Sequence, residues 1–190
     1  MKGALAPGYS LAIIPCTGVK DPYMEEGPAQ EIWTGAHFQY TLIYVESFYD
    51  EVLVMSYKYG LVKPTDTIQS YNIDMRTAKP REHLQWWYLL KGQIDKLADE
   101  RPPALVSLFT GSFERDRIIR EFVRHKVEQV TVPWEGMGIG YRQQAVFDAE
   151  PPFDPEKVKS GGYKIELDSG KTVNRYLPPP TKLTGEIEWE

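Results

Sequence analysis

The chain has 190 residues, which suits one domain with a sizeable core. Its net charge of −5 argues against tight nonspecific DNA binding, because phosphate contacts usually come from a basic surface. No segment reaches the roughly 18 uninterrupted apolar residues of a membrane span, and a lone cysteine, Cys16, excludes an intrachain disulfide. We therefore expect a cytoplasmic protein with no membrane partner, and its oligomeric state stays open.

Strand and helix patterns alternate along residues 1–150. Apolar runs predict strands at 11–15, 51–56, 104–110 and 129–134, and helical spacing predicts helices at 29–49, from Pro80 to before Pro102, from about Ser112, and at 141–148. Strands that are apolar throughout are expected when both faces of a sheet are covered. The pattern predicts an α/β fold of three layers, α/β/α, around a mostly parallel four-stranded sheet.

The C-terminal residues follow a different pattern. Residues 163–167 and 172–176 alternate around a turn at 168–171, which is typical of a β-hairpin, and a Pro178–Pro180 run follows. We therefore predict an α/β domain at 1–150 and a C-terminal extension at 151–190 with a hairpin and a proline-rich end.

The predicted strands end in short polar loops, and open α/β sheets bind ligands at that edge. The first loop contains Cys16, Thr17, Lys20, Asp21 and Tyr23. Lys20 and Asp21 are the strongest candidates there, with a solvated turn as the alternative. A catalytic role for Cys16 would require an activating base, and a packed small side chain is the simpler interpretation.

The second loop carries Ser56, Lys58 and Tyr59, and Gly60 permits a tight turn. Two aromatic side chains around a cation favour a stacking or anion-binding pocket over a plain surface turn. The connection continues to residue 79, which is longer than most loops, and long ordered loops are often functional. It carries three further candidates: Tyr71 for stacking on a planar ligand, Asn72 for a base edge or a water, and Asp74 as a carboxylate.

Glycines follow the third and fourth strands. Gly111 and Ser112 begin a helix, and the later segment contains Glu135, Gly138, Gly140 and Arg142. Its G-x-G-x-G spacing differs from the dinucleotide fingerprint and lacks a P-loop lysine, so a nicotinamide or nucleoside-triphosphate site is not expected. Free backbone N–H groups there suit a phosphate, with a packing turn as the alternative. The histidines, His37, His83 and His125, lack partners at metal-ligand spacing, so we expect no metal and no cofactor.

Together these loops resemble the small bacterial and phage YaaA-like domains. The similar features are Pro-Cys-(Ser/Thr)-x-x-Lys, Pro-Ala…(Tyr/Trp)-Thr-Gly…Phe, Ser-x-Lys-Tyr-Gly-Leu…Tyr and Gly-Met-Gly-Ile-Gly-x-(Arg/Gln). The residues that match are Pro15, Cys16, Thr17, Lys20, Pro28, Ala29, Trp33, Thr34, Gly35, Phe38, Ser56, Lys58, Tyr59, Gly60, Leu61, Tyr71, Gly136, Met137, Gly138, Ile139, Gly140 and Arg142. The resemblance covers about residues 10–147.

The resemblance implies a distant relationship to the uracil-DNA glycosylase fold and to the lysine-transferring domain of archaeosine synthase. It also implies similarity to an anti-phage glycosylase that removes glucosylated hydroxymethylcytosine from phage DNA. Asp21-Pro22-Tyr23 is similar to the Asp-Pro-Tyr of uracil-DNA glycosylases. Their His-Pro-Ser signature is absent, so uracil is not the expected base.

The leading hypothesis is a DNA N-glycosylase that needs no cofactor, removes a modified base from phage DNA and leaves an abasic site. The catalytic candidates are Lys20, Asp21, Asn72, Asp74 and Glu135, with Asp21 first among the carboxylates. The substrate-binding candidates are Cys16, Thr17, Tyr23, Ser56, Lys58, Tyr59, Tyr71, Gly111, Ser112, Gly138, Gly140 and Arg142. The alternatives are a base-modifying transferase and a nucleotide or nucleic-acid sensor without catalysis.

Overall fold

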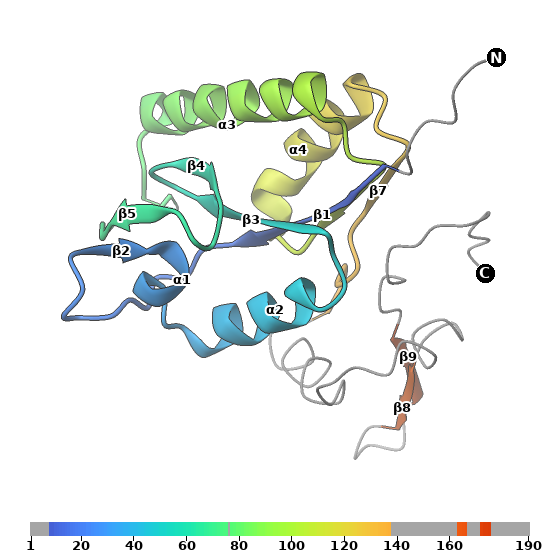
Figure 1. Cartoon of the computed structure of the whole chain (residues 1–190), viewed down its shortest axis with the longest axis horizontal. Coiled ribbons are helices and arrows are strands. Elements are labelled where there is room, and N and C mark those ends of the chain that lie inside the picture. The colour runs from blue at the N-terminus through green and yellow to red at the C-terminus, as the bar shows by residue number, and fades with distance from the viewer. Residues whose placement is uncertain (1–7, 76, 138–162, 167–171, 176–190) are drawn as a thin grey trace.

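A five-stranded sheet forms the centre of the computed structural model, which describes residues 8–75, 77–137, 163–166 and 172–175 (Figure 1). Its order is β4-β3-β1-β6-β7. The bounds are β1 (Ser10–Pro15), β3 (Glu51–Ser56), β4 (Gly60–Val62), β6 (Leu105–Leu108) and β7 (Gln129–Thr131). Strands β3, β1, β6 and β7 are parallel to their neighbours, and only β4 pairs antiparallel, with β3. The four predicted strands and the α/β class are confirmed, but the predicted four-stranded sheet is wrong, because β4 pairs with β3 and adds a fifth strand at the edge.

Helices cover both faces of the sheet, as Figure 1 shows. Helices α1 (Ala29–Ile32) and α2 (Ala36–Glu46) lie on one side, and α3 (Pro80–Glu100) and α4 (Ser112–Arg124) lie on the other. The side chains of β1 alternate between the two cores: Ala12 and Ile14 pack with α1 and α2, and Leu11 and Ile13 pack with α3 and α4. Burial on both faces explains why these strands are apolar throughout.

The order of the parallel strands creates a point of divergence at their carboxyl ends. Counted along the chain, these strands lie in the order 2-1-3-4 across the sheet. The chain leaves β1 towards α1 and α2 on one face, whereas it leaves the neighbouring β6 towards α4 on the other (Figure 1). Open α/β sheets bind ligands at such points.

The single helix predicted for residues 29–49 is wrong, because the chain breaks between α1 and α2. Trp33 leaves the helix and forms an isolated antiparallel bridge with Lys20. Gly35 precedes α2 with Thr17 directly against its α-carbon, so that a Cβ would collide with the threonine side chain. The residues between α1 and α2 therefore hold the loop after β1 in place through two contacts, Lys20 with Trp33 and Thr17 with Gly35.

The long connection after β3 is more ordered than predicted. It contains β4 and β5 (Thr67–Gln69), and β5 pairs antiparallel with β2 (Glu26–Pro28). Helix α3 begins at Pro80 as predicted, and the Glu82 carboxylate accepts a hydrogen bond of 2.6 Å from the Lys79 backbone N–H. At α4 the N-cap residue is Gly111, whereas the sequence suggested Ser112.

The predicted C-terminal hairpin is present as β8 (Tyr163–Glu166) and β9 (Thr172–Arg175), which pair antiparallel. The helix expected at 141–148 lies outside the described residues. In the part of the chain that the structure describes, no helix has the length and apolar character needed to cross a bilayer.

Candidate active site

The loops that follow β1 and β3 lie side by side, because Pro15 pairs with Met55 at the carboxyl ends of these parallel strands. The Cys16 backbone N–H continues this pairing with a hydrogen bond of 3.0 Å to the Met55 carbonyl. Candidates that are far apart in the sequence therefore meet at one edge of the sheet, as predicted from the strand ends.

Tyr71 connects the two loops. Its hydroxyl lies 2.7 Å from Ser56 Oγ and 3.6 Å from Cys16 Sγ. Its ring packs edge-on against Tyr59 and Trp33, at centroid distances of 5.7 and 6.5 Å. Burial, and then the neighbouring Cys16, raise the pKa of Tyr71, so its hydroxyl stays protonated and available for hydrogen bonding.

Two lysines approach the ring of Tyr71. Lys20 Nζ lies 5.2 Å from the ring centroid, and Lys58 Nζ lies 5.9 Å from it and 4.9 Å from the Tyr59 ring. Neither ammonium group forms an ion pair with any residue that the structure describes. Two uncompensated cations beside aromatic rings favour an anionic ligand that contains a planar group.

Cys16 lies under this cluster as a thiol. Burial raises its pKa, and the hydrogen bond with Tyr71 and the charge of Lys20 offset only part of that effect. A raised pKa is the opposite of what a nucleophilic cysteine needs. The structure therefore favours a packed polar contact for Cys16.

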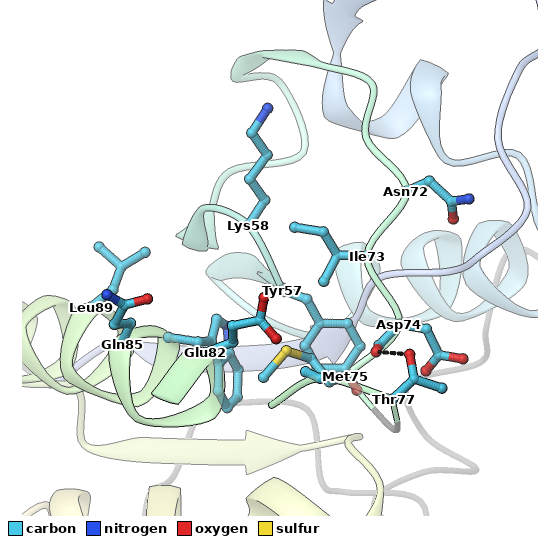
Figure 2. Close-up of a pocket in the computed structure, with 12 residues that line it drawn as sticks. Tyr57, Lys58, Asn72, Ile73, Asp74, Met75, Thr77, Glu82, Gln85 and Leu89 are labelled. Atoms are coloured by element: carbon cyan, nitrogen blue, oxygen red, sulfur yellow. Dashed lines mark hydrogen bonds between the residues drawn. The ribbon is translucent and has the colours of Figure 1, made fainter. Parts of the chain in front are cut away.

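A pocket of about 560 Å³ adjoins Lys58 (Figure 2). Its size is within the roughly 300–1,000 Å³ of typical ligand pockets. Tyr57 lies in the middle, with Asn72 to Met75 and Thr77 on one side, α3 on the other, and Lys58 at the rim. The lining residues are Tyr57, Lys58, Asn72, Ile73, Asp74, Met75, Thr77, Ala78, Glu82, Gln85, Trp86 and Leu89.

A model of DUF6884, a family of unknown function, matches residues 11–147. The chain belongs to the DUF6884 family. No curated protein and no solved structure matched the chain. The family match includes every candidate site residue and ends before the predicted C-terminal extension, so the cluster around Tyr71 is part of the family domain.

Two predicted carboxylates lie in different environments. Asp74 lines the pocket, and its backbone carbonyl accepts a 3.0 Å hydrogen bond from Thr77 Oγ1. The Asp21 carboxylate accepts a 2.7 Å hydrogen bond from the Tyr23 backbone N–H, so it stabilises its own loop. Of these two predicted carboxylate residues, only Asp74 therefore belongs to the lining of the pocket.

The other predicted residues are dispersed. Thr17 Oγ1 accepts a 3.2 Å hydrogen bond from the Val19 N–H, and Tyr23 is 94% exposed. Glu135 lies beyond β7, where it forms a 2.9 Å ion pair with Arg115 and its side chain is 65% exposed. Gly111 is the N-cap residue of α4 and Ser112 is its first residue, and Gly138, Gly140 and Arg142 lie outside the described residues.

Sequence reasoning missed Glu114 and the role of Tyr57. The Tyr57 hydroxyl donates a 2.8 Å hydrogen bond to Glu114 Oε1, and Glu114 is only 5% exposed. A glutamate in the first turn of a helix is so common that its position carried no signal. Burial first, and then the negative charge of Glu114, raise the pKa of Tyr57.

The turn that carries Lys58 and Tyr59 is held by Gln93 of α3. Gln93 Oε1 accepts a 2.7 Å hydrogen bond from the Leu61 N–H, and Nε2 donates to the Tyr59 and Leu61 carbonyls at 3.1 and 3.2 Å. Gly60 has a φ of +71°, a conformation that glycine adopts readily. The position of Lys58 is thus supported by three hydrogen bonds behind it.

A second charged cluster joins α3 to α4. Asp95, Glu121 and His125 have the composition of a metal site. Their carboxylates are already engaged by cations: Lys91 Nζ lies 2.6 Å from Asp95 and 3.6 Å from Glu121, and Arg124 pairs with both. We interpret this group as an interhelical ion-pair cluster.

Proposed function

We propose that the chain is a DNA N-glycosylase that removes a modified base, and that the cluster around Tyr71 and the adjoining pocket form its active site. The observation that carries the proposal is the convergence of Lys20 and Lys58 on Tyr71, without a carboxylate partner among the described residues. A glycosylase holds a flipped nucleotide by its charged backbone, by stacking and by the base edge. The lysines, the aromatic rings and Asn72 supply groups of these three kinds.

The reaction that we propose is hydrolysis of the N-glycosidic bond. Water attacks C1′ of the sugar while the bond to the base breaks and its electron pair goes to the base nitrogen. The Asp74 carboxylate stabilises the positive charge on the sugar and accepts the proton from water, and that proton ends on the departing base. Lys58, at the pocket rim, stabilises negative charge on the leaving group.

The kinship with YaaA-like domains and with uracil-DNA glycosylases is part of the same proposal. A mostly parallel sheet with helices on both faces is compatible with it. The glucosylated cytosine of phage DNA is the substrate that this kinship favours, and a role in defence against phage follows from it.

The test is incubation of the protein, with EDTA, with unmodified, hydroxymethylated and glucosylated phage DNA, followed by assays for abasic sites and released bases. We expect abasic sites confined to one modified DNA. Binding without release from any DNA would contradict the proposal and favour a transferase or a sensor.

A further inference from the structure

The long helix α3 is apolar on its outer face as well as on its inner face. Leu90 and Ile94 are buried against the sheet, as expected for a covering helix. On the outer side, Leu84 is 50% exposed and Tyr88 is 63% exposed. Figure 1 shows no described element beyond α3 on the side away from the sheet. Apolar side chains four positions apart lie next to each other on a helix, and such exposed patches mark interaction surfaces.

The residues along this outer face form an ordered charge pattern. With 3.6 residues per turn, four exposed residues fall within about 20° of one line: Arg81, Tyr88, Gly92 and Asp99. Arg81 forms no ion pair with any residue that the structure describes. The Asp99 side chain is 73% exposed, with His125 Nδ1 at 3.5 Å. The line therefore begins with a cation, is uncharged in the middle and ends with an anion.

This pattern is complementary to a second copy of itself in the antiparallel direction. When two such helices pack about a two-fold axis, residues equally distant from the midpoint of the line face each other. Arg81 then faces Asp99 of the second copy, and Tyr88 faces Gly92. Parallel packing would instead bring equal charges together at both ends, so the charges favour the antiparallel arrangement.

Gly92 gives the two helices room to approach. A glycine inside a helix is destabilising relative to alanine, so its presence in the middle of α3 needs a local reason. Packing within the chain does not supply one, because a Cβ at Gly92 would meet no described atom within 4 Å. In the antiparallel pair, the absent side chain leaves space for the Tyr88 ring of the second copy.

We propose that two copies of the chain form a dimer through the outer faces of α3. The helices pack antiparallel about a two-fold axis, with Tyr88 against Gly92 and Arg81 paired with Asp99. A contact along one helix pair about 30 Å long is at the small end of specific interfaces, so its dissociation constant is in the micromolar range. The dimer does not depend on the proposed function, since no residue of this line is assigned to the reaction.

The first test is sedimentation velocity of the full chain from about 1 to 300 µM. We expect the wild type to change from monomer to dimer within this range. Tyr88→Glu should weaken association by about tenfold or more, because it places two charges at the apolar centre of the contact. Ile43→Glu is the matched control: Ile43 is 50% exposed on α2, on the opposite side of the sheet, so its replacement should leave the dimer unchanged.

The second test exchanges the charges. Arg81→Glu and Asp99→Arg should each weaken association by about tenfold when studied alone, because both end contacts become repulsive. An equimolar mixture of the two variants should dimerise about as strongly as the wild type, since each chain then carries the charges that the other lacks. Both residues are exposed, and circular dichroism checks that the variants fold.

Several outcomes would overturn the dimer proposal. A wild type that stays monomeric at the highest concentration would do so, as would a dimer that Tyr88→Glu leaves intact. A mixture of the charge variants that stays monomeric would refute the antiparallel pairing. A monomeric wild type whose DNA affinity falls with Tyr88→Glu would assign this face to nucleic acid instead. The assay for base release is separate, so the proposed function and the dimer can fail independently.

Discussion

The two charged clusters of this fold differ in how their charges are compensated. Between α3 and α4, Asp95 is engaged by Lys91, Arg124 and His125, and Glu121 by two of these cations. At the carboxyl edge of the sheet, Lys20 and Lys58 approach aromatic rings and pair with no carboxylate among the residues described.

Whether the charges of a cluster are compensated indicates whether the cluster needs a ligand. A cluster whose opposite charges satisfy one another joins two helices and needs no further partner. Two cations left uncompensated beside one ring repel each other, and an anion relieves that repulsion. We therefore interpret the first cluster as stabilising and propose ligand binding for the second, and four experiments test this interpretation.

The largest expected effect is that of Asp74→Asn on turnover. Removing the carboxylate should lower base release by about 100-fold or more, the usual contribution of an acid–base group, while DNA binding persists. Asp21→Asn is the matched control, because its carboxylate serves the backbone of its own loop. Equal losses in both variants would show that the geometry does not identify the catalytic carboxylate.

The stability of the turn that carries Lys58 should depend on Gly60. A Cβ there would meet the Gln93 side chain at a φ of +71°, so we expect Gly60→Ala to destabilise the fold by about 1–3 kcal/mol. Gly92→Ala is the control, because that glycine lies in α3 with open space around it, and it should stabilise by about 0.5–1 kcal/mol. Urea denaturation measures both changes.

Lys58→Met and Lys91→Met compare the two clusters directly. Lys58→Met should weaken DNA binding about tenfold and lower the salt dependence by about one unit of slope, with little change in stability. Lys91→Met should leave binding unchanged and lower the melting temperature, because it removes a partner of Asp95 and Glu121. The reverse pattern would refute the assignment.

The smallest effect is a pH dependence of stability from Asp95. Burial alone would raise its pKa, but hydrogen bonds from Lys91 and His125 and nearby positive charges outweigh burial and lower the pKa to about 2. The stabilisation is therefore present above the ordinary aspartate pKa of about 4 and is lost as the pH falls through about 2. Its size is about 1 kcal/mol, since the carboxylate is partly exposed to solvent.

The control for this last prediction is Asp95→Asn. Its free energy of unfolding should differ from that of the wild type at pH 5, and the difference should shrink steadily as the pH falls from about 4 through 2. A constant difference across that range would show that the charge of Asp95 contributes nothing to stability.

The parallel strands were predictable because burial on both faces makes each of them continuously apolar. Short strands were not: β4 and β5 have three residues each and owe their pairing to partners elsewhere in the chain. The break at Trp33 was also hidden, because the apolar spacing of residues 29–49 continues through it. Its cause is a tertiary contact with the loop after β1.

The candidate site was predictable where it follows from strand ends. Cys16, Ser56 and Lys58 follow parallel neighbours, so their meeting required only the topology. The partner of Tyr57 was not predictable, since Glu114 follows another strand and reaches Tyr57 only through the packing of α4. A position after a strand end does not by itself make a residue part of the site. Glu135 lies at the same edge, but it forms an ion pair with Arg115.

The central position of β1 has a consequence for synthesis. Strand β1 is synthesised well before one of its two neighbours, β6, which begins only at Leu105. At about 5–20 residues per second, the apolar first strand waits several seconds for that neighbour. During this time its unpaired edge is a site for misassembly with other nascent chains. The protein's yield in a cell should therefore depend on chaperone capacity more than its finished stability suggests.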